Sequence, residues 1–228
     1  MSTASYKGQK YTEGKSVQVN DILVVEESLK ITINNTPFTI TMRTPGSEKE
    51  LVRGLLFSEN VYVDIDTDPI ISIIGKSEKG FINQVDVTIP TAKVGKGMEI
   101  SRSIVSVSSC GICGKSELDE LSINSKKIIA EEKLDSELVG RMFEKMNLAQ
   151  NTFKQSGGSH AAAAFTIDGN LLVIQEDIGR HNAVDKVIGS LLFQNHIPAK
   201  SCLNRLILHR QLHISLTIFL SQQSVMAY

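Results

Sequence analysis

The chain has few cysteines, no excess of either charge and no long apolar run, and each shortage excludes a class of protein. Three cysteines in 228 residues are too few for a disulfide framework. Twenty-four Lys and Arg against 25 Asp and Glu give a formal charge of −1, so no nucleic-acid-binding surface is indicated. No stretch approaches the roughly 18 apolar residues of a membrane span, and the N-terminus has no signal-peptide core. We expect a cytoplasmic protein with no membrane segment and no nucleic-acid partner.

The first 100 residues are predicted to form a β-rich α+β lobe. Residues 29–33 and 38–42 alternate apolar and polar side chains, as half-buried strands do. Between them lies Asn34-Asn35, a pair that tolerates turn conformations. The pattern predicts a β-hairpin.

A helix and two more strands are expected in the same lobe. Ser47 precedes Glu50 by three residues, which is the capping-box pattern at the start of a helix. The apolar run at 51–57 follows directly. Residues 70–74 and 84–89 are the further strand candidates.

The second part of the chain, residues 101–228, has a different pattern. Helical spacing of apolar residues extends over 138–153. Residues 161–167 and 171–175 flank an Asp-Gly pair, which favours a tight hairpin. A helix is expected from 183 to about 193. We find no internal repeat and no low-complexity linker.

Two cysteines in one loop are the residues that best fit covalent chemistry. Cys110 and Cys113 are two residues apart, each followed by a glycine, and Lys115 lies nearby. A lysine lowers the pKa of a neighbouring thiol and so favours the nucleophilic thiolate. The loop can present a thiolate to a partner, hold a metal, or switch between dithiol and disulfide. A sulfur carrier also needs such an arm, since it must accept and release sulfur by exchange.

The alternatives for this loop are weaker. A structural zinc site needs four ligands, so zinc would have to recruit Cys202 or scattered histidines. In thioredoxin-type proteins the second cysteine lies in a helix, which Gly114 would interrupt here. Zinc deaminases need a glutamate two residues after the ligand histidine, and Ala183 occupies that position after His181.

Two polar clusters frame the second hairpin and are candidates for a ligand site. Residues 156–160 precede its first strand, and residues 176–182 follow its second strand. Gly179 permits a sharp turn, and Arg180 offers a planar fork suited to phosphate or carboxylate. The N–H groups at the start of the next helix also favour an anion.

A structural role for the second cluster remains open. Asn182 with Asp185 can cap a helix, and Arg180 can pair with Asp177. Both alternatives use the same residues without any ligand.

Four ordered motifs resemble those of the FdhD/NarQ family of formate dehydrogenase accessory proteins. They are Arg43-Thr44-Pro45-Gly46 with residues 54–59, the cysteine loop 109–115, Gly157-Gly158-Ser159-His160-Ala161-Ala162, and residues 176–186. The resemblance extends from about Asp21 to Cys202.

The resemblance implies a sulfurtransferase that acts between a cysteine desulfurase and a molybdenum cofactor. The bis-guanine-dinucleotide form of the cofactor would be sulfurated before it enters formate dehydrogenase. By position, Cys110 would carry the persulfide and Cys113 would be its partner. The residues expected to bind the cofactor are Gly157, Gly158, His160, Asp177, Gly179, Arg180, His181 and Asn182. We expect no tightly bound metal.

The resemblance also implies an α/β fold and a homodimer. The family joins a small α+β N-terminal part to a cytidine-deaminase-like α/β/α domain. From about residue 203 the sequence departs from the family pattern, with no Asp or Glu after Asp185 and no glycine after Gly189. Two other functions remain open, a cofactor-binding chaperone without sulfur relay and a zinc-binding interaction module.

Overall fold

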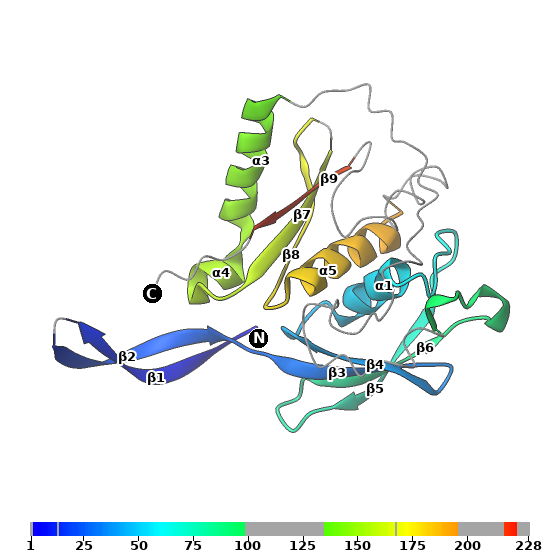
Figure 1. The fold of residues 1–228 in the computed structure, drawn as a ribbon, viewed down its shortest axis with the longest axis horizontal. Coiled ribbons are helices and arrows are strands. Elements are labelled where there is room, and N and C mark those ends of the chain that lie inside the picture. The colour runs from blue at the N-terminus through cyan, green and yellow to red at the C-terminus, as the bar shows by residue number, and fades with distance from the viewer. Residues whose placement is uncertain (1, 13, 99–134, 167, 196–216, 223–228) are drawn as a thin grey trace, which may run out of the picture.

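The computed structural model describes residues 2–12, 14–98, 135–166, 168–195 and 217–222. Helices and strands are mixed along the chain, and three separate sheets are present in this part of it (Figure 1). The α and β composition expected from the sequence is confirmed.

The N-terminal lobe is a four-stranded mixed sheet in the order β4-β3-β6-β5. Its elements are β3 (Glu27–Ile33), β4 (Thr36–Arg43), α1 (Glu48–Ser58), β5 (Ile70–Lys76), β6 (Ile82–Thr88) and a 3-10 turn at Thr91–Lys93. The β3–β4 and β5–β6 pairs are antiparallel, whereas β3 and β6 are parallel. Asn34 and Asn35 have φ values of 49° and 63°, so the predicted turn is confirmed.

The predicted helix α1 is present, but the predicted capping box is wrong. Ser47 is in the left-handed region with φ 54°, and its side chain makes no capping hydrogen bond. Its hydroxyl instead donates to Gln175 Oε1 at 3.0 Å, in the other lobe. A contact across 128 residues of sequence has therefore replaced a local one.

The second lobe contains a three-stranded antiparallel sheet in the order β8-β7-β9. Its elements are α3 (Ser136–Ala149), α4 (Asn151–Ser156), β7 (His160–Thr166), β8 (Leu171–Asp177), α5 (Arg180–Phe193) and β9 (Thr217–Gln222). The hairpin predicted around the Asp168-Gly169 pair is confirmed, because β7 and β8 pair in antiparallel fashion. The helix expected over 138–153 is interrupted at Gln150, where ψ is 84°, and α5 begins three residues before Ala183.

Strand β7 is buried on both faces, which produces three layers. Alternate residues of a strand point to opposite faces. Ala161, Ala163 and Phe165 form a core with Met142 and Met146 of α3. Ala162 and Ala164 form another core with Ala183, Val187 and Leu191 of α5. The described part of this lobe therefore has the helix–sheet–helix layering expected for an α/β/α domain.

Helices α1 and α5 join the two lobes through close backbone contact. A Cβ on Gly54 would lie 1.8 Å from the carbonyl oxygen of Asp185. A Cβ on Gly189 would lie 1.9 Å from the carbonyl oxygen of Glu50. The pairing of 54 with 185 and 50 with 189 shows that the helices run in opposite senses. Both glycines are present because a side chain has no space there.

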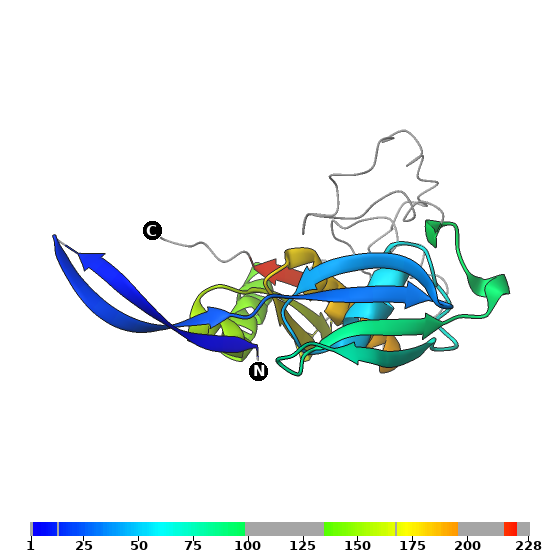
Figure 2. The ribbon, with the colours of Figure 1, turned by 90° about the horizontal axis from the view of Figure 1, so that it is seen from below.

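Residues 3–24 form a hairpin arm that the sequence patterns did not indicate. Strands β1 (Thr3–Thr12) and β2 (Lys15–Val24) pair along their whole length and extend beyond α4, away from both lobes (Figures 1 and 2). At the base, Ser2 and Thr152 hydroxyls lie 3.2 Å apart, and Thr3 Oγ1 donates to Gln155 Oε1 at 3.1 Å. The arm is therefore anchored on α4.

Strand β9 lies in the segment that departs from the family pattern. It pairs with β7, with Ala161 opposite Gln222 and Thr166 opposite Thr217. That segment thus supplies a strand to the sheet. The proposed lobe boundary near residue 100 falls outside the described residues. No helix in the described ranges is both long and apolar enough to cross a membrane.

Candidate functional site

The catalytic candidates Cys110 and Cys113 lie outside the described residues, as does Cys202. The predicted cofactor-binding residues are all described. They come together at one end of the second lobe, because β7 begins and β8 ends there. His160 and Asp177 are opposite each other in the strand register. Helix α5 starts three residues after Asp177, so both polar clusters belong to one region.

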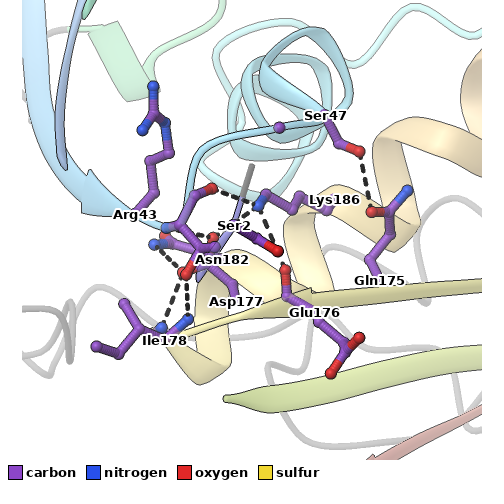
Figure 3. A network of polar contacts seen from close by, with 12 residues as sticks. Ser2, Arg43, Ser47, Gln175, Glu176, Asp177, Ile178, Asn182 and Lys186 are labelled. Atoms are coloured by element: carbon purple, nitrogen blue, oxygen red, sulfur yellow. Dashed lines mark hydrogen bonds and ion pairs between the residues drawn. The ribbon is translucent and has the colours of Figure 1, made fainter. Parts of the chain in front are cut away.

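Asp177 is the centre of this region and is fully buried. Its Oδ1 accepts hydrogen bonds from the Gly179 backbone N–H at 2.8 Å and from Asn182 Nδ2 at 3.1 Å. Its Oδ2 accepts from the Thr44 backbone N–H at 3.1 Å and pairs with Lys186 Nζ at 2.8 Å. Figure 3 shows these contacts converging on the carboxylate. Four internal donors thus satisfy both oxygens.

The same network connects the two lobes. Lys186 Nζ also donates to the Thr44 carbonyl at 2.9 Å, and Asn182 Nδ2 donates to the Met42 carbonyl at 2.7 Å. Thr44 Oγ1 accepts from the Ile178 N–H at 2.9 Å. The end of β4 is thereby held against the start of α5. Lys186 is 2% exposed, so its charge depends on Asp177 for compensation.

The two structural alternatives for the second cluster are wrong. Asp177 pairs with Lys186 rather than with Arg180. Asn182 is the third residue of α5, so it does not cap the helix, and the N-cap is Gly179. Sequence reasoning did not assign a role to Lys186. Lys186 follows Asn182 by four residues, which places both side chains on one face of a helix. This spacing is the feature of the sequence that indicates a shared role.

Gly179 is needed for space rather than for an unusual backbone conformation. Its φ of −94° is open to any residue. A Cβ there would lie 2.8 Å from Asn182 Nδ2 and would displace the amide from Asp177. The sharp turn expected at Gly179 is therefore not what requires the glycine.

Arg180 and His181 form the first turn of α5. Arg180 is exposed, and no partner for its side chain is found among the described residues, whereas His181 is half-buried. The first turn of α5 contains no acidic residue. A cation at the N-terminus of a helix gives this position a positive potential, which attracts anions.

The Gly157-Gly158-Ser159-His160 segment connects α4 to β7. Gly157 has φ 66° and ends α4 in the left-handed conformation, which strains any residue with a side chain. Gly158 is half-buried. The His160 ring is half-buried and its Nδ1 is buried, with no hydrogen-bond partner among the described residues. A buried ring nitrogen without a partner is unusual and consistent with a ligand contact.

Glu176 has a structural role that the sequence did not indicate. Its carboxylate accepts from the backbone N–H groups of Thr152 at 2.8 Å and Phe153 at 2.7 Å, and from Ser159 Oγ at 2.9 Å. It therefore caps the N-terminus of α4. This contact fixes α4, and with it Gly157, to the end of β8.

Arg43, the first residue of the first motif, is fully buried. Its Nη2 pairs with Glu48 Oε1 at 3.1 Å and donates to the Ile82 carbonyl. Burial lowers the pKa of its guanidinium, while the charges of Glu48 and Asp177 oppose that shift. Its Nε and Nη1 have no hydrogen-bond partner among the described residues.

The region around the start of α5 gathers groups that can bind an anion. The described residues contain no group of three or more His, Cys, Asp or Glu side chains placed to hold a metal ion. The region offers an exposed guanidinium, a helix N-terminus, two adjacent glycines and a ring nitrogen that has no partner in the described part of the chain. These are groups that contact the phosphates and base of a nucleotide.

The chain is similar to known proteins over most of its length. Residues 24–204 match the model of the FdhD/NarQ family. It is 38% identical over 186 residues to the sulfur carrier protein FdhD of Mycobacterium tuberculosis, covering 78% of this chain and 67% of that protein. The chain is also 36% identical over 198 residues to the protein of the same name from Sulfolobus acidocaldarius. The aligned segment covers 87% of this chain and 73% of that protein.

A solved structure has a similar fold. The crystal structure of a putative formate dehydrogenase accessory protein from Desulfotalea psychrophila superposes with a TM-score of 0.59. The two sequences are 20% identical, and the superposed residues make up 84% of this chain and 69% of the other chain. The residues that match the family model include the ends of β4 and β8 and the start of α5, which form the Asp177 network. The chain is a member of the FdhD/NarQ family.

Proposed function

We propose that this chain is a sulfur carrier that serves a formate dehydrogenase. The observation that carries the proposal is the family match, together with relatives named sulfur carrier protein FdhD. The Cys110-x-x-Cys113 motif lies inside the matched segment and would supply the thiolate. The donor would be the persulfide of a cysteine desulfurase, and the acceptor a molybdenum bis-guanine-dinucleotide cofactor.

The transfer to the chain requires one exchange step. The Cys110 thiolate attacks the outer sulfur of the desulfurase persulfide, which forms a new S–S bond on Cys110. The bond between that sulfur and the desulfurase cysteine breaks, and this cysteine leaves as a thiolate. Attack of Cys113 on Cys110 Sγ would then form a Cys110–Cys113 disulfide and release the sulfur as sulfide. The two thiols supply the two electrons for that reduction.

The cofactor, as substrate, would be held by the region around the start of α5. Arg180 and the N-terminus of α5 would contact phosphate oxygens, and His160 would contact a polar group of the ligand. Gly157 and Gly158 leave space for close approach. Because Asp177 already has four donors, we assign it to positioning the Gly179 turn and Asn182 rather than to direct contact.

Cys110→Ala is expected to abolish sulfur uptake. The chain would be incubated with a cysteine desulfurase and cysteine, and added sulfur located by peptide mass mapping. The wild type should carry the adduct on Cys110, and Cys202→Ala should behave as the wild type because Cys202 lies outside the motif. Equal labelling of Cys110→Ala and wild type would show that Cys110 is not the acceptor.

Arg180→Ala is expected to weaken nucleotide binding about 10- to 100-fold, since a hydrogen bond to a charged group contributes about 1.5–3 kcal/mol. Guanosine diphosphate is the probe, titrated by calorimetry against the full chain. Arg141→Ala is the matched control, because Arg141 is also exposed but lies on α3 and pairs with Glu137. A loss that is equal in both variants would point to general charge rather than to this site.

A chaperone that binds the cofactor without relaying sulfur is the second candidate, supported by the same anion-binding features. It predicts that Cys110→Ala keeps full nucleotide affinity and full support of formate dehydrogenase. The sulfur-carrier proposal predicts that Cys110→Ala keeps the affinity but loses the support. Measuring both properties on one variant separates the two functions.

A further inference from the structure

Two consecutive carboxylates at the end of β8 act on opposite faces of the sheet. Successive residues of a strand point to opposite faces. Asp177 lies opposite His160 in the register and holds the first turn of α5. Glu176 lies opposite Ala161, whose side chain packs on the face covered by α3. Its carboxylate points away from the contacts of Asp177 (Figure 3). Each carboxylate therefore holds a different part of the chain.

Glu176 joins a helix and a loop at one carboxylate. Oε2 accepts from the backbone N–H of Thr152, and Oε1 accepts from the backbone N–H of Phe153. The Ser159 hydroxyl also donates to Oε1, at 2.9 Å. Hydrogen bonds to an ionised carboxylate are roughly twice as strong as those between neutral groups. The start of α4 and the residue before β7 are thus fixed to the same side chain.

The two glycines before Ser159 are held by α4 as well. The Gly157 N–H donates to the Phe153 carbonyl at 2.7 Å. The Gly158 N–H donates to Ser156 Oγ at 3.2 Å, and this hydroxyl donates in turn to the Thr152 carbonyl at 2.8 Å. The position of both glycines therefore follows that of α4, which Glu176 caps.

Ser159 is the last attachment of this segment before the His160 ring. Its side chain bonds to Glu176, and the residue is 1% exposed. His160 is the next residue and the first of β7, so its side chain is directed to the opposite face, on which Asp177 holds α5. The direction of the His160 ring thus depends on an anchor on the other side of the sheet.

We propose that Glu176 is a positioning residue for the nucleotide-binding region. Through Ser159 it fixes the His160 ring relative to Arg180, while Asp177 fixes the start of α5 that carries Arg180. Glu176 acts without touching the ligand, because its oxygens already accept three hydrogen bonds inside the chain. This role rests on the proposed function, since it requires a nucleotide bound between His160 and Arg180.

Calorimetric titration of the full chain with guanosine diphosphate tests this role. Ser159→Ala removes the bond to the loop and leaves both bonds from Glu176 to α4, so the helix stays capped. The affinity is expected to fall about 10-fold, the effect of losing one hydrogen bond to a charged group. Glu176→Gln should weaken binding at least as much, because its amide nitrogen would face a donor.

Asp135→Ala is the control for lost helix capping. Asp135 caps α3 in the same lobe by accepting from the Glu137 N–H at 3.3 Å. Its replacement should lower the stability measured by urea denaturation, because a capping carboxylate is lost, and leave the affinity for guanosine diphosphate unchanged. An equal loss of affinity in Asp135→Ala and Ser159→Ala would overturn the specific role of Glu176.

A double-mutant cycle separates positioning of His160 from a general weakening of the fold. Ser159→Ala should change the affinity less than about 2-fold in a His160→Ala background, but still about 10-fold in an Arg180→Ala background. Equal losses in the two backgrounds, or an unchanged affinity in Ser159→Ala alone, would overturn the role of Glu176 and leave the binding site standing. Unchanged affinity in both His160→Ala and Arg180→Ala would overturn the site itself, and the role of Glu176 with it.

Discussion

Gly54→Ala is expected to lower the free energy of unfolding by about 3 kcal/mol, the upper part of the range for overpacked sites. The added Cβ would lie 1.8 Å from the Asp185 carbonyl oxygen, so α1 and α5 must separate. Backbone atoms of a helix cannot rotate away as a side chain can. Gly189→Ala should have a similar effect, because its Cβ would meet the Glu50 carbonyl at 1.9 Å. Urea denaturation followed by circular dichroism measures both.

Gly140→Ala is the control for these substitutions. Gly140 lies inside α3 and is exposed, and an added Cβ there would have nothing within 4 Å. Replacing a helical glycine by alanine there should stabilise the chain by about 0.5–1 kcal/mol. If Gly54→Ala and Gly140→Ala shifted stability in the same direction, close packing of α1 on α5 would not be what joins the lobes.

Local patterns predicted the elements that local physics determines. The two asparagines at the first hairpin take left-handed conformations that few other residues accept, so the turn is recognisable from the residues alone. Strand β7 was recognisable as a short apolar run, because both of its faces are covered by helices. In each case the residues responsible are adjacent in the sequence.

The failures have a common cause, which is competition from distant partners. The Ser47 hydroxyl has a helix N-terminus available but bonds to Gln175 in the other lobe. Strands β1 and β2 were missed because neither packs on a core, so apolar alternation is weak and Lys10 and Asp21 interrupt it. A strand that has no core to cover does not carry a clear period of two.

The candidate site shows the same difference between what local sequence indicates and what distant contacts determine. The motifs around Thr44 and around Asp177 were each recognisable by resemblance, 133 residues apart. Nothing in either motif indicates that the Thr44 N–H donates to Asp177, or that Lys186 bonds to both. Resemblance located the residues, and only the fold distinguishes those that support the site from those that remain available to a ligand.

Asp177→Asn is expected to destabilise the chain by about 3–5 kcal/mol, the cost of leaving one member of a buried ion pair uncompensated. Lys186 is 2% exposed and loses its counterion, while the amide nitrogen of asparagine faces donors that need an acceptor. Asp168→Asn is the matched control. Asp168 is exposed in the β7–β8 loop, so its effect should stay within about 0.5 kcal/mol.

The double variant Asp177→Asn with Lys186→Met separates the cost of an uncompensated buried charge from the cost of altered packing. Methionine has a similar length without charge, so the buried cation is removed together with its partner. Part of the stability should return, because an uncompensated charge costs more than a missing ion pair. Strictly additive losses in urea denaturation would contradict the coupling. Since Lys186 also bonds to the Thr44 carbonyl, the recovered fraction measures how much of the contact between the lobes depends on charge and how much on this hydrogen bond.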